Sequence, residues 1–246
     1  MKPRRYLAVA AAFVAVSFAA LAAANEAVIR RALESKMGGM RIEGIQPGPV
    51  PGLFEVRYRG ADGVNVIYVD GTGTYVIQGQ VYDLRNGRDL TEERLRKLNA
   101  IKFESLPFDQ AIKVQRGNGR RVLAMFSDPY CPYCVQFEKV LQQVNDITVY
   151  VFMYPVIRPQ NADHSKAVWC SPDRAKAWLD LALHHKQSSA SPACDNPIDK
   201  NLQLGRSLGV NGTPTLILAN GERISAGLSA KDLSSVLDEV AKTKDR

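Results

Sequence analysis

Two cysteines separated by two residues, Cys131 and Cys134, are the groups in this sequence best suited to chemistry. They follow a short apolar strand expected over residues 121–126 and open a helix expected over residues 132–144. Cys131 then lies at the helix N-cap. Pro132 takes the first helical position, where its missing N–H costs nothing. The unpaired N–H groups of the first turn and the positive end of the helix stabilise a thiolate on Cys131.

A dithiol in this position is typical of thiol–disulfide exchange. We expect Cys131, at the helix start and nearer the solvent, to attack a substrate disulfide. Cys134, one turn further in and more buried, would then resolve the mixed disulfide and release the substrate. The alternative is a structural disulfide between the two, but so small a ring would add little stability.

The remaining cysteines, Cys170 and Cys194, bring the total to four, which allows three pairings. If the CxxC pair is reactive, these two are left to each other. A disulfide closing a loop of about 25 residues would stabilise the fold by roughly 3 kcal/mol in the chain-entropy model. A zinc site on all four thiols is a weak alternative, because the second pair is not a CxxC and oxidation would compete. We expect no metal ion and no cofactor.

A Thr213-Pro214 step stands just before a strand expected over residues 215–218. With a cis peptide bond, Pro214 facing the reactive cysteine would leave the backbone of Thr213 free to pair with an extended substrate segment. A trans proline that begins an edge strand is equally compatible with the sequence. Tyr130 and Tyr133 flank the reactive sulfur and are further candidates for contacting apolar substrate.

Four other titratable residues have simpler interpretations. Asp128 could tune the reactive thiol or relay protons, although a solvated carboxylate at a strand end is the plainer interpretation. His164, His184 and His185 stand apart from the CxxC in sequence, and we expect them on helix surfaces.

From about residue 108 onward, strands alternate with helices in the order β–α–β–helical insertion–β–β–α, which is that of a thioredoxin-like α/β domain. Asn220-Gly221 between the last two strands is a strong hairpin signal. The expected strands cover residues 121–126, 147–154, 215–218 and 223–226, and the expected helices cover 132–144, 163–169, 172–185, 197–208 and 228–242.

Residues 25–86 have the pattern of a small α+β unit. A short helix over residues 26–36 stops at two glycines, as a helix end should. A unit this small buries little core. We therefore expect one strand edge to pair with a second copy of the chain, unless the unit packs on the larger domain. Three strand-like runs follow the helix, over residues 54–58, 64–69 and 74–77.

Residues 87–107 are expected to link the two parts through a helix over residues 91–103. Thr91 is a suitable N-cap for that helix, with acidic residues in the first turn.

The N-terminus resembles a secretory signal peptide over residues 1–24: a basic start, an alanine-rich apolar run and three alanines at the cleavage position. An uncleaved membrane anchor is the alternative, because the run is nearly long enough to span a bilayer. Cleavage removes three cations and no acidic residue, which lowers the formal charge from +7 to +4. So modest an excess gives no reason to expect nucleic-acid binding. Export places the cysteines in an oxidising compartment.

Seven segments of the sequence together form a specific set of motifs. They are Val122–Asp128, Cys131–Cys134, Ala167–Cys170, Ser191–Asp195, Leu208–Pro214, Ile45–Val50 and Ile77–Asp83. This set resembles the periplasmic disulfide isomerases DsbC and DsbG, and the resemblance covers nearly the whole mature chain. Pro132-Tyr133 between the reactive cysteines is as in DsbG, whereas the second cysteine pair is as in DsbC.

The resemblance implies a homodimer. Each subunit would have an α+β N-terminal dimerisation domain (residues 25–86), a linker helix (residues 87–107) and an α/β thioredoxin-like catalytic domain with a helical insertion (residues 108–246). It also implies a periplasmic thiol–disulfide interchange protein that isomerises or reduces disulfides in misfolded exported proteins. A membrane reductase of the DsbD type would keep the dithiol reduced, and the cis-proline loop would bind substrate. A net dithiol oxidase and a holdase chaperone with incidental thiols are the alternatives.

Overall fold

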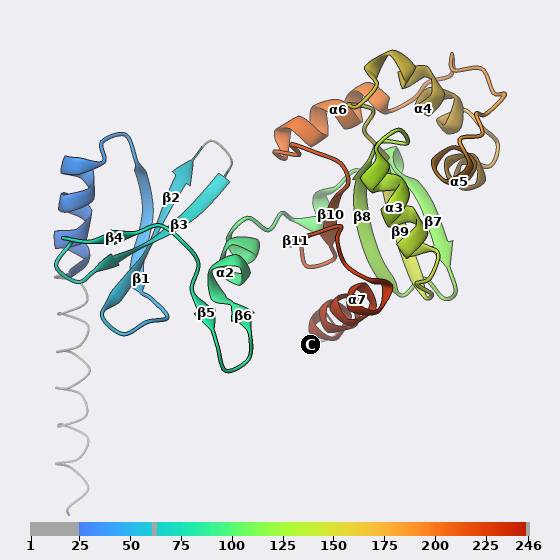
Figure 1. Ribbon diagram of the computed structural model, residues 1–246. Coiled ribbons are helices and arrows are strands. Elements are labelled where there is room, and N and C mark those ends of the chain that lie inside the picture. Colours follow the sequence, from blue (N-terminus) through green and yellow to red (C-terminus); the bar gives the residue numbers. More distant parts are fainter. Residues whose placement is uncertain (1–24, 61–62, 245–246) are drawn as a thin grey trace, which may run out of the picture. The chain divides into compact units, whose positions relative to one another are not determined.

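The computed structural model describes residues 25–60 and 63–244, so the predicted signal peptide over residues 1–24 lies outside the described residues. The chain divides into two compact units after Asn99, and each is described by itself (Figure 1). Across the described ranges, no helix has the length and apolar character needed to cross a bilayer.

The N-terminal unit is built on a four-stranded antiparallel sheet with the strand order β1-β2-β3-β4. A helix over residues 25–36 covers one face, where Ile29 and Leu33 pack with Val56 and Ile67 of the sheet. The first strand was not predicted, because a glycine and a bulge interrupt its alternation. The strands are β1 (Arg41–Pro47), β2 (Leu53–Gly60), β3 (Gly63–Asp70) and β4 (Val76–Ile77).

The helix α2 (Leu90–Leu98) differs from its prediction in both its start and its end. Asp89, rather than Thr91, caps it by accepting a hydrogen bond from a first-turn N–H. Thr91 is instead buried, and its hydroxyl lies 2.6 Å from that of Tyr68 in β3. These contacts place α2 within the N-terminal unit, whereas we predicted it as part of a linker. A two-stranded hairpin, β5 (Tyr82–Asp83) with β6 (Arg88–Asp89), contacts α2 through β5. Two 3-10 turns follow α2 in the sequence: η1 (Phe103–Ser105) and η2 (Phe108–Gln110).

The C-terminal unit is a five-stranded sheet with the strand order β11-β10-β8-β9-β7. β8 and β9 run parallel and every other neighbouring pair is antiparallel. The hairpin predicted at Asn220-Gly221 joins β10 to β11, as expected. β7 was not predicted, although Ile112 and Val114 alternate with polar residues as a half-buried strand requires. The strands are β7 (Ile112–Arg116), β8 (Arg121–Ser127), β9 (Ile147–Met153), β10 (Thr215–Leu218) and β11 (Arg223–Ile224).

Helices enclose two apolar cores of this unit. The larger core joins the sheet to residues of α3, α5 and α7 and includes the fully buried Trp178. The smaller one gathers Phe126, Phe152 and Tyr154 around two aromatic contacts. The central strand β8 is therefore buried along most of its length, which gives the loop that follows it a rigid base. The helices are α3 (Pro132–Leu141), α4 (Ala162–Trp169), α5 (Arg174–His184), α6 (Ile198–Ser207) and α7 (Ala230–Lys244), with a 3-10 turn η3 (Pro159–Asn161) before α4.

Candidate active site

Cys131 is the N-cap residue of α3, and Pro132 is the first residue of that helix. The chain reaches this point directly from β8 through a short turn closed by a 3.1 Å hydrogen bond from the N–H of Cys131 to the carbonyl oxygen of Asp128. The Cys131 side chain makes no cap hydrogen bond of its own. The free N–H groups of the first helical turn are therefore available to stabilise negative charge on its sulfur.

Cys131 and Cys134 are free thiols with no disulfide between them, and both residues are only 2% exposed. Our expectation that Cys131 lies nearer the solvent than Cys134 does not agree with this equal burial. The surroundings of Cys134 disfavour its thiolate. Burial raises the pKa of the Cys134 thiol to about 12, although the hydroxyl of Ser127, the backbone of Asp128 and the hydroxyl of Thr213 lower it in part. Cys134 therefore stays protonated at neutral pH, as a resolving thiol does until it attacks the mixed disulfide.

The Thr213-Pro214 peptide bond is cis, which the sequence left open. The Cys131 thiol donates a hydrogen bond of 3.1 Å to the carbonyl oxygen of Thr213. Strand β10 begins at the next position, Thr215, and pairs with Phe126 of β8, so two adjacent strands bring this loop and the reactive cysteine together. The structure thus brings Thr213 and Pro214 to the CxxC, as the sequence motif suggested.

Asp128 is neither solvated nor directed at the reactive sulfur. Its side chain is fully buried, and one carboxylate oxygen accepts a 2.8 Å bond from the N–H of Tyr130. The other oxygen accepts from the N–H groups of Val156 and Ile157, at 2.8 and 2.7 Å. Three charge-assisted bonds make this carboxylate the tie between the turn before Cys131 and the loop after β9.

The two tyrosines beside the CxxC have different surroundings. Tyr133 is 76% exposed at the start of α3. Tyr130 is half-buried: its hydroxyl hydrogen-bonds Nδ1 of His164, and the guanidinium of Arg158 lies 5.5 Å above its ring. His164, which we expected on a helix surface, is half-buried on α4 and bonded to Tyr130.

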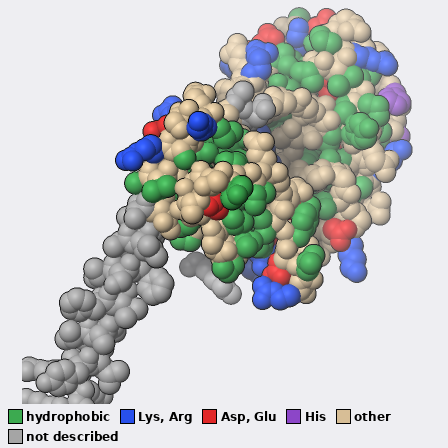
Figure 2. All heavy atoms as spheres, turned by 60° about the vertical axis from the view of Figure 1, so that its left-hand side comes forward, with side chains coloured by type: hydrophobic (Ala, Val, Ile, Leu, Met, Phe, Trp, Pro, Cys, Tyr) green, Lys and Arg blue, Asp and Glu red, His purple; other side chains and the backbone are tan. Residues whose placement is uncertain are grey.

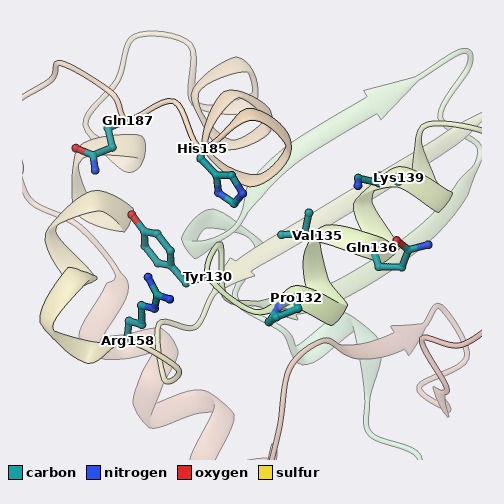
Figure 3. Close-up of a pocket in the computed structure, with 8 residues that line it drawn as sticks. All are labelled: Tyr130, Pro132, Val135, Gln136, Lys139, Arg158, His185 and Gln187. Carbon is teal, nitrogen blue, oxygen red and sulfur yellow. The ribbon is translucent and has the colours of Figure 1, made fainter.

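A hollow of about 620 Å³ opens next to the reactive helix (Figure 3). Tyr130, Pro132 and Val135 line it from the side of the CxxC, and Arg158 and His185 line it from the segments around α4 and α5. Arg158 and the exposed Val156 and Ile157 were missed by our reading of the sequence. A positive charge and two apolar residues between a strand and a proline form no motif, so only the fold places Arg158 at the hollow.

Cys170 and Cys194 form a disulfide with a Cα–Cα distance of 5.9 Å. It joins the end of α4 to the segment before α6, both within the helical insertion. The zinc alternative has no support, because this bond uses two of the four thiols. Within residues 25–60 and 63–244, there is no cluster of three or more histidine, cysteine or acidic side chains that could hold a metal ion.

The sheet order, the helix after the central strand, the buried CxxC at that helix and the proline loop beside it together define a thioredoxin-like thiol–disulfide oxidoreductase. Comparison with known proteins agrees. The family model of a thioredoxin-like domain matches residues 108–241, and that of the disulfide bond isomerase protein N-terminal domain matches residues 20–92. These matches confirm the predicted fold class of an α+β N-terminal domain and a thioredoxin-like α/β domain.

Individual relatives match over most of the chain. The probable thiol:disulfide interchange protein DsbC of Bordetella pertussis is 36% identical over 209 residues, which are 85% of this chain and 73% of that protein. The thiol:disulfide interchange protein DsbC of Escherichia coli is 30% identical over 231 residues, covering 91% of this chain and 92% of that one. A crystal structure of a disulfide interchange protein from Neisseria gonorrhoeae, 39% identical, superimposes with a TM-score of 0.53 and covers 55% of this chain and 99% of that chain. The chain belongs to the DsbC family of thiol:disulfide interchange proteins, and it is a disulfide isomerase of the thioredoxin-like class.

Proposed function

We propose that Cys131 is the attacking thiolate and Cys134 the resolving thiol of this isomerase. The observation that carries the proposal is that the two cysteines, although equally buried, occupy different positions in α3. Cys131 stands at the N-terminus of α3, where the N–H groups of the first turn have no partner within the helix. Cys134 is held as a thiol by burial, which raises its pKa to about 12.

In the first step, the Cys131 thiolate attacks one sulfur of a substrate disulfide. A Cys131–substrate disulfide forms, the substrate disulfide breaks, and the second substrate sulfur leaves as a thiolate that takes a proton from water. The Thr213 carbonyl, 3.1 Å from the Cys131 sulfur, lies beside the place where the new bond forms. We infer that Thr213, Pro214, Tyr130 and Tyr133 contact the substrate segment there.

Two outcomes follow from this mixed disulfide. If another substrate thiolate attacks the substrate sulfur, a new pairing forms and the Cys131 thiolate is regenerated, which is isomerisation. If Cys134 loses its proton and attacks the Cys131 sulfur, both substrate cysteines leave reduced and the enzyme is left with a Cys131–Cys134 disulfide. The high pKa of Cys134 delays the second route and therefore favours isomerisation.

We propose that two copies of the chain associate through the N-terminal unit. β4 pairs with β3 on one side only among the described strands, and exposed apolar side chains lie on it and in the stretches of sequence that flank it. In Figure 2, hydrophobic side chains cover much of the forward face of this unit. An edge strand with this composition is suited to pairing with its own copy about a twofold axis. The exposed side chains are Tyr75, Val76, Ile77, Tyr82 and Leu84.

We further propose that the protein works in the periplasm on misfolded exported proteins, and that a membrane reductase of the DsbD type keeps its dithiol reduced. The signal-like pattern of residues 1–24 supports export. An isomerase needs Cys131 as a free thiolate, so a supply of electrons is required in an oxidising compartment.

The test is refolding of a scrambled multi-disulfide protein by wild type, Cys131→Ala and Cys134→Ala. Wild type should restore native activity, and Cys131→Ala should fall to the uncatalysed rate. Cys134→Ala should keep partial isomerisation and accumulate mixed disulfides. Full activity of Cys131→Ala would refute the proposal and favour a holdase with incidental thiols. A dithiol found mainly oxidised in the cell would favour a net oxidase.

A further inference from the structure

The hollow beside α3 shares its wall with the reactive centre. Tyr130 and Pro132, the two neighbours of Cys131 in sequence, both line it, and Val135 continues the same wall one helical turn on (Figure 3). At about 620 Å³ it has room for two or three side chains of a peptide. A chain whose disulfide lies at Cys131 therefore has its neighbouring residues within reach of this hollow.

The charge of the hollow is of one sign. Its charges come from two cations, Lys139 of α3 and Arg158 of the loop after β9, and its other polar lining is His185 beyond α5 and two glutamines, with no acidic residue. Within the part of the chain that the structure describes, neither Lys139 nor Arg158 has an ion-pair partner. Arg158 is held in place by its position 5.5 Å above the Tyr130 ring.

The carboxylates closest in sequence do not offset this charge from within the hollow. Asp128 is fully buried and its oxygens accept backbone N–H bonds. Glu138 is also buried, and its side chain accepts a bond from the Trp178 indole on the far side of α3 from the solvent. Solvent-exposed cations without partners beside an apolar wall are complementary to an acidic segment.

We propose that this hollow is a subsite for acidic residues flanking the disulfide that Cys131 attacks. The inference rests on the proposed function, because it concerns the same exchange reaction. Lys139 and Arg158 attract the acidic side chains, while Tyr130, Pro132 and Val135 contact the apolar parts of the segment. The protein then reacts faster with disulfides in acidic surroundings than with the same disulfides in neutral ones.

The test uses two peptides that differ only beside a single cysteine, with Asp and Glu in one and Asn and Gln in the other. Each peptide carries a chromogenic aromatic thiol as a mixed disulfide. Attack by Cys131 forms the Cys131–peptide disulfide, breaks the peptide–aryl disulfide and releases the aryl thiolate, whose absorbance gives the second-order rate constant. We expect the acidic peptide to react roughly three- to tenfold faster at low salt, as two exposed charge contacts allow, and the ratio to shrink at high salt.

The double variant Lys139→Gln with Arg158→Gln should bring the ratio of the two rate constants close to one. The matched control, Lys200→Gln with Lys231→Gln, removes the same charge from exposed positions on α6 and α7 outside the hollow and should keep the wild-type ratio. Equal rates with wild type, a ratio that survives in the hollow variant, or an equal loss in the control variant would each overturn the subsite. If neither peptide reacts with wild type, the proposed function fails and the subsite fails with it.

Discussion

Glu138 provides a direct test of how the reactive helix is held in the fold. This residue of α3 is 2% exposed, and its carboxylate accepts a 2.8 Å hydrogen bond from the indole N–H of Trp178 in α5. Burial raises its pKa above the usual value, while the bond from Trp178 and the charge of Arg116 act in the opposite direction. α3 and α5 are thus joined by a carboxyl group whose charged form is disfavoured.

The sign of the pH dependence follows from that raised pKa. The stability contributed by protonated Glu138 is fully present below its unfolded pKa, near 4.5, and is lost as the pH rises through the higher folded value. Glu138→Gln keeps an oxygen for the Trp178 N–H and has no charge to bury. We therefore expect Glu138→Gln to match wild type below about pH 4.5 and to become the more stable of the two as the pH rises.

Glu138→Leu is the matched variant, because it also removes the charge but leaves the Trp178 N–H unpaired. An orphaned buried donor costs about 1–3 kcal/mol. For a chain of this size that corresponds to a fall in Tm of roughly 2–12 °C at pH 5. The assay is thermal unfolding of the three proteins from pH 4 to 8, followed by circular dichroism. A stability difference between Glu138→Gln and wild type that does not change with pH would refute this account of the buried carboxyl.

Three further predictions concern other named groups. Replacing Cys170 and Cys194 together by alanine should lower the free energy of unfolding by about 3 kcal/mol under oxidising conditions, the loop-closure value for a sequence separation of 24. In reductant, wild type and variant should be equally stable, and a remaining difference in stability would contradict a stabilising disulfide. Asp128→Asn should lower the free energy of unfolding, measured with denaturant, by about 1–3 kcal/mol, because an amide NH2 must face backbone N–H donors that the carboxylate now satisfies. An unchanged denaturation midpoint would be inconsistent with these hydrogen bonds. In Cys131→Ala, the ultraviolet absorbance of the Cys134 thiolate should appear only above about pH 10, because burial raises its pKa to about 12; thiolate formed near neutrality would exclude its role as a protonated resolving thiol.

The sequence predicted the parts of the site that local rules govern. The CxxC spacing, the apolar strand before it and Pro132 after Cys131 are enough to place the dithiol at a helix start, because each feature acts within a few residues. The hairpin at Asn220-Gly221 followed from the same kind of rule. The remaining cysteine pair followed from elimination.

The parts that depend on packing could not be predicted in this way. Asp128 was expected to be solvated, because nothing near it in sequence indicates the two N–H donors of residues 156 and 157, which come from a different strand end. His164 was expected on the surface, since its partner Tyr130 is 34 residues away. The contact between Cys131 and the carbonyl of Thr213 likewise joins residues more than 80 positions apart in sequence.

The N-terminus of α2 shows how tertiary contacts override a local preference. Thr91 is a good N-cap residue by type, but its hydroxyl is bonded to Tyr68 and also accepts from the N–H of Val81, so Asp89 takes the cap position. β7 was missed for a related reason. Its alternation spans only five residues, and its pairing with β9 is what makes it a strand.

The division of roles between the two reactive sulfurs is tested most directly by trapping the mixed disulfide. Cys134→Ala, mixed with a scrambled disulfide protein and quenched in acid, should yield a covalent complex whose linkage, mapped by peptide mass spectrometry, joins Cys131 to a substrate cysteine. The reciprocal variant Cys131→Ala should yield no such complex, because the Cys134 thiol stays protonated at neutral pH. A stable complex through Cys134, formed in Cys131→Ala at a comparable rate, would contradict the account.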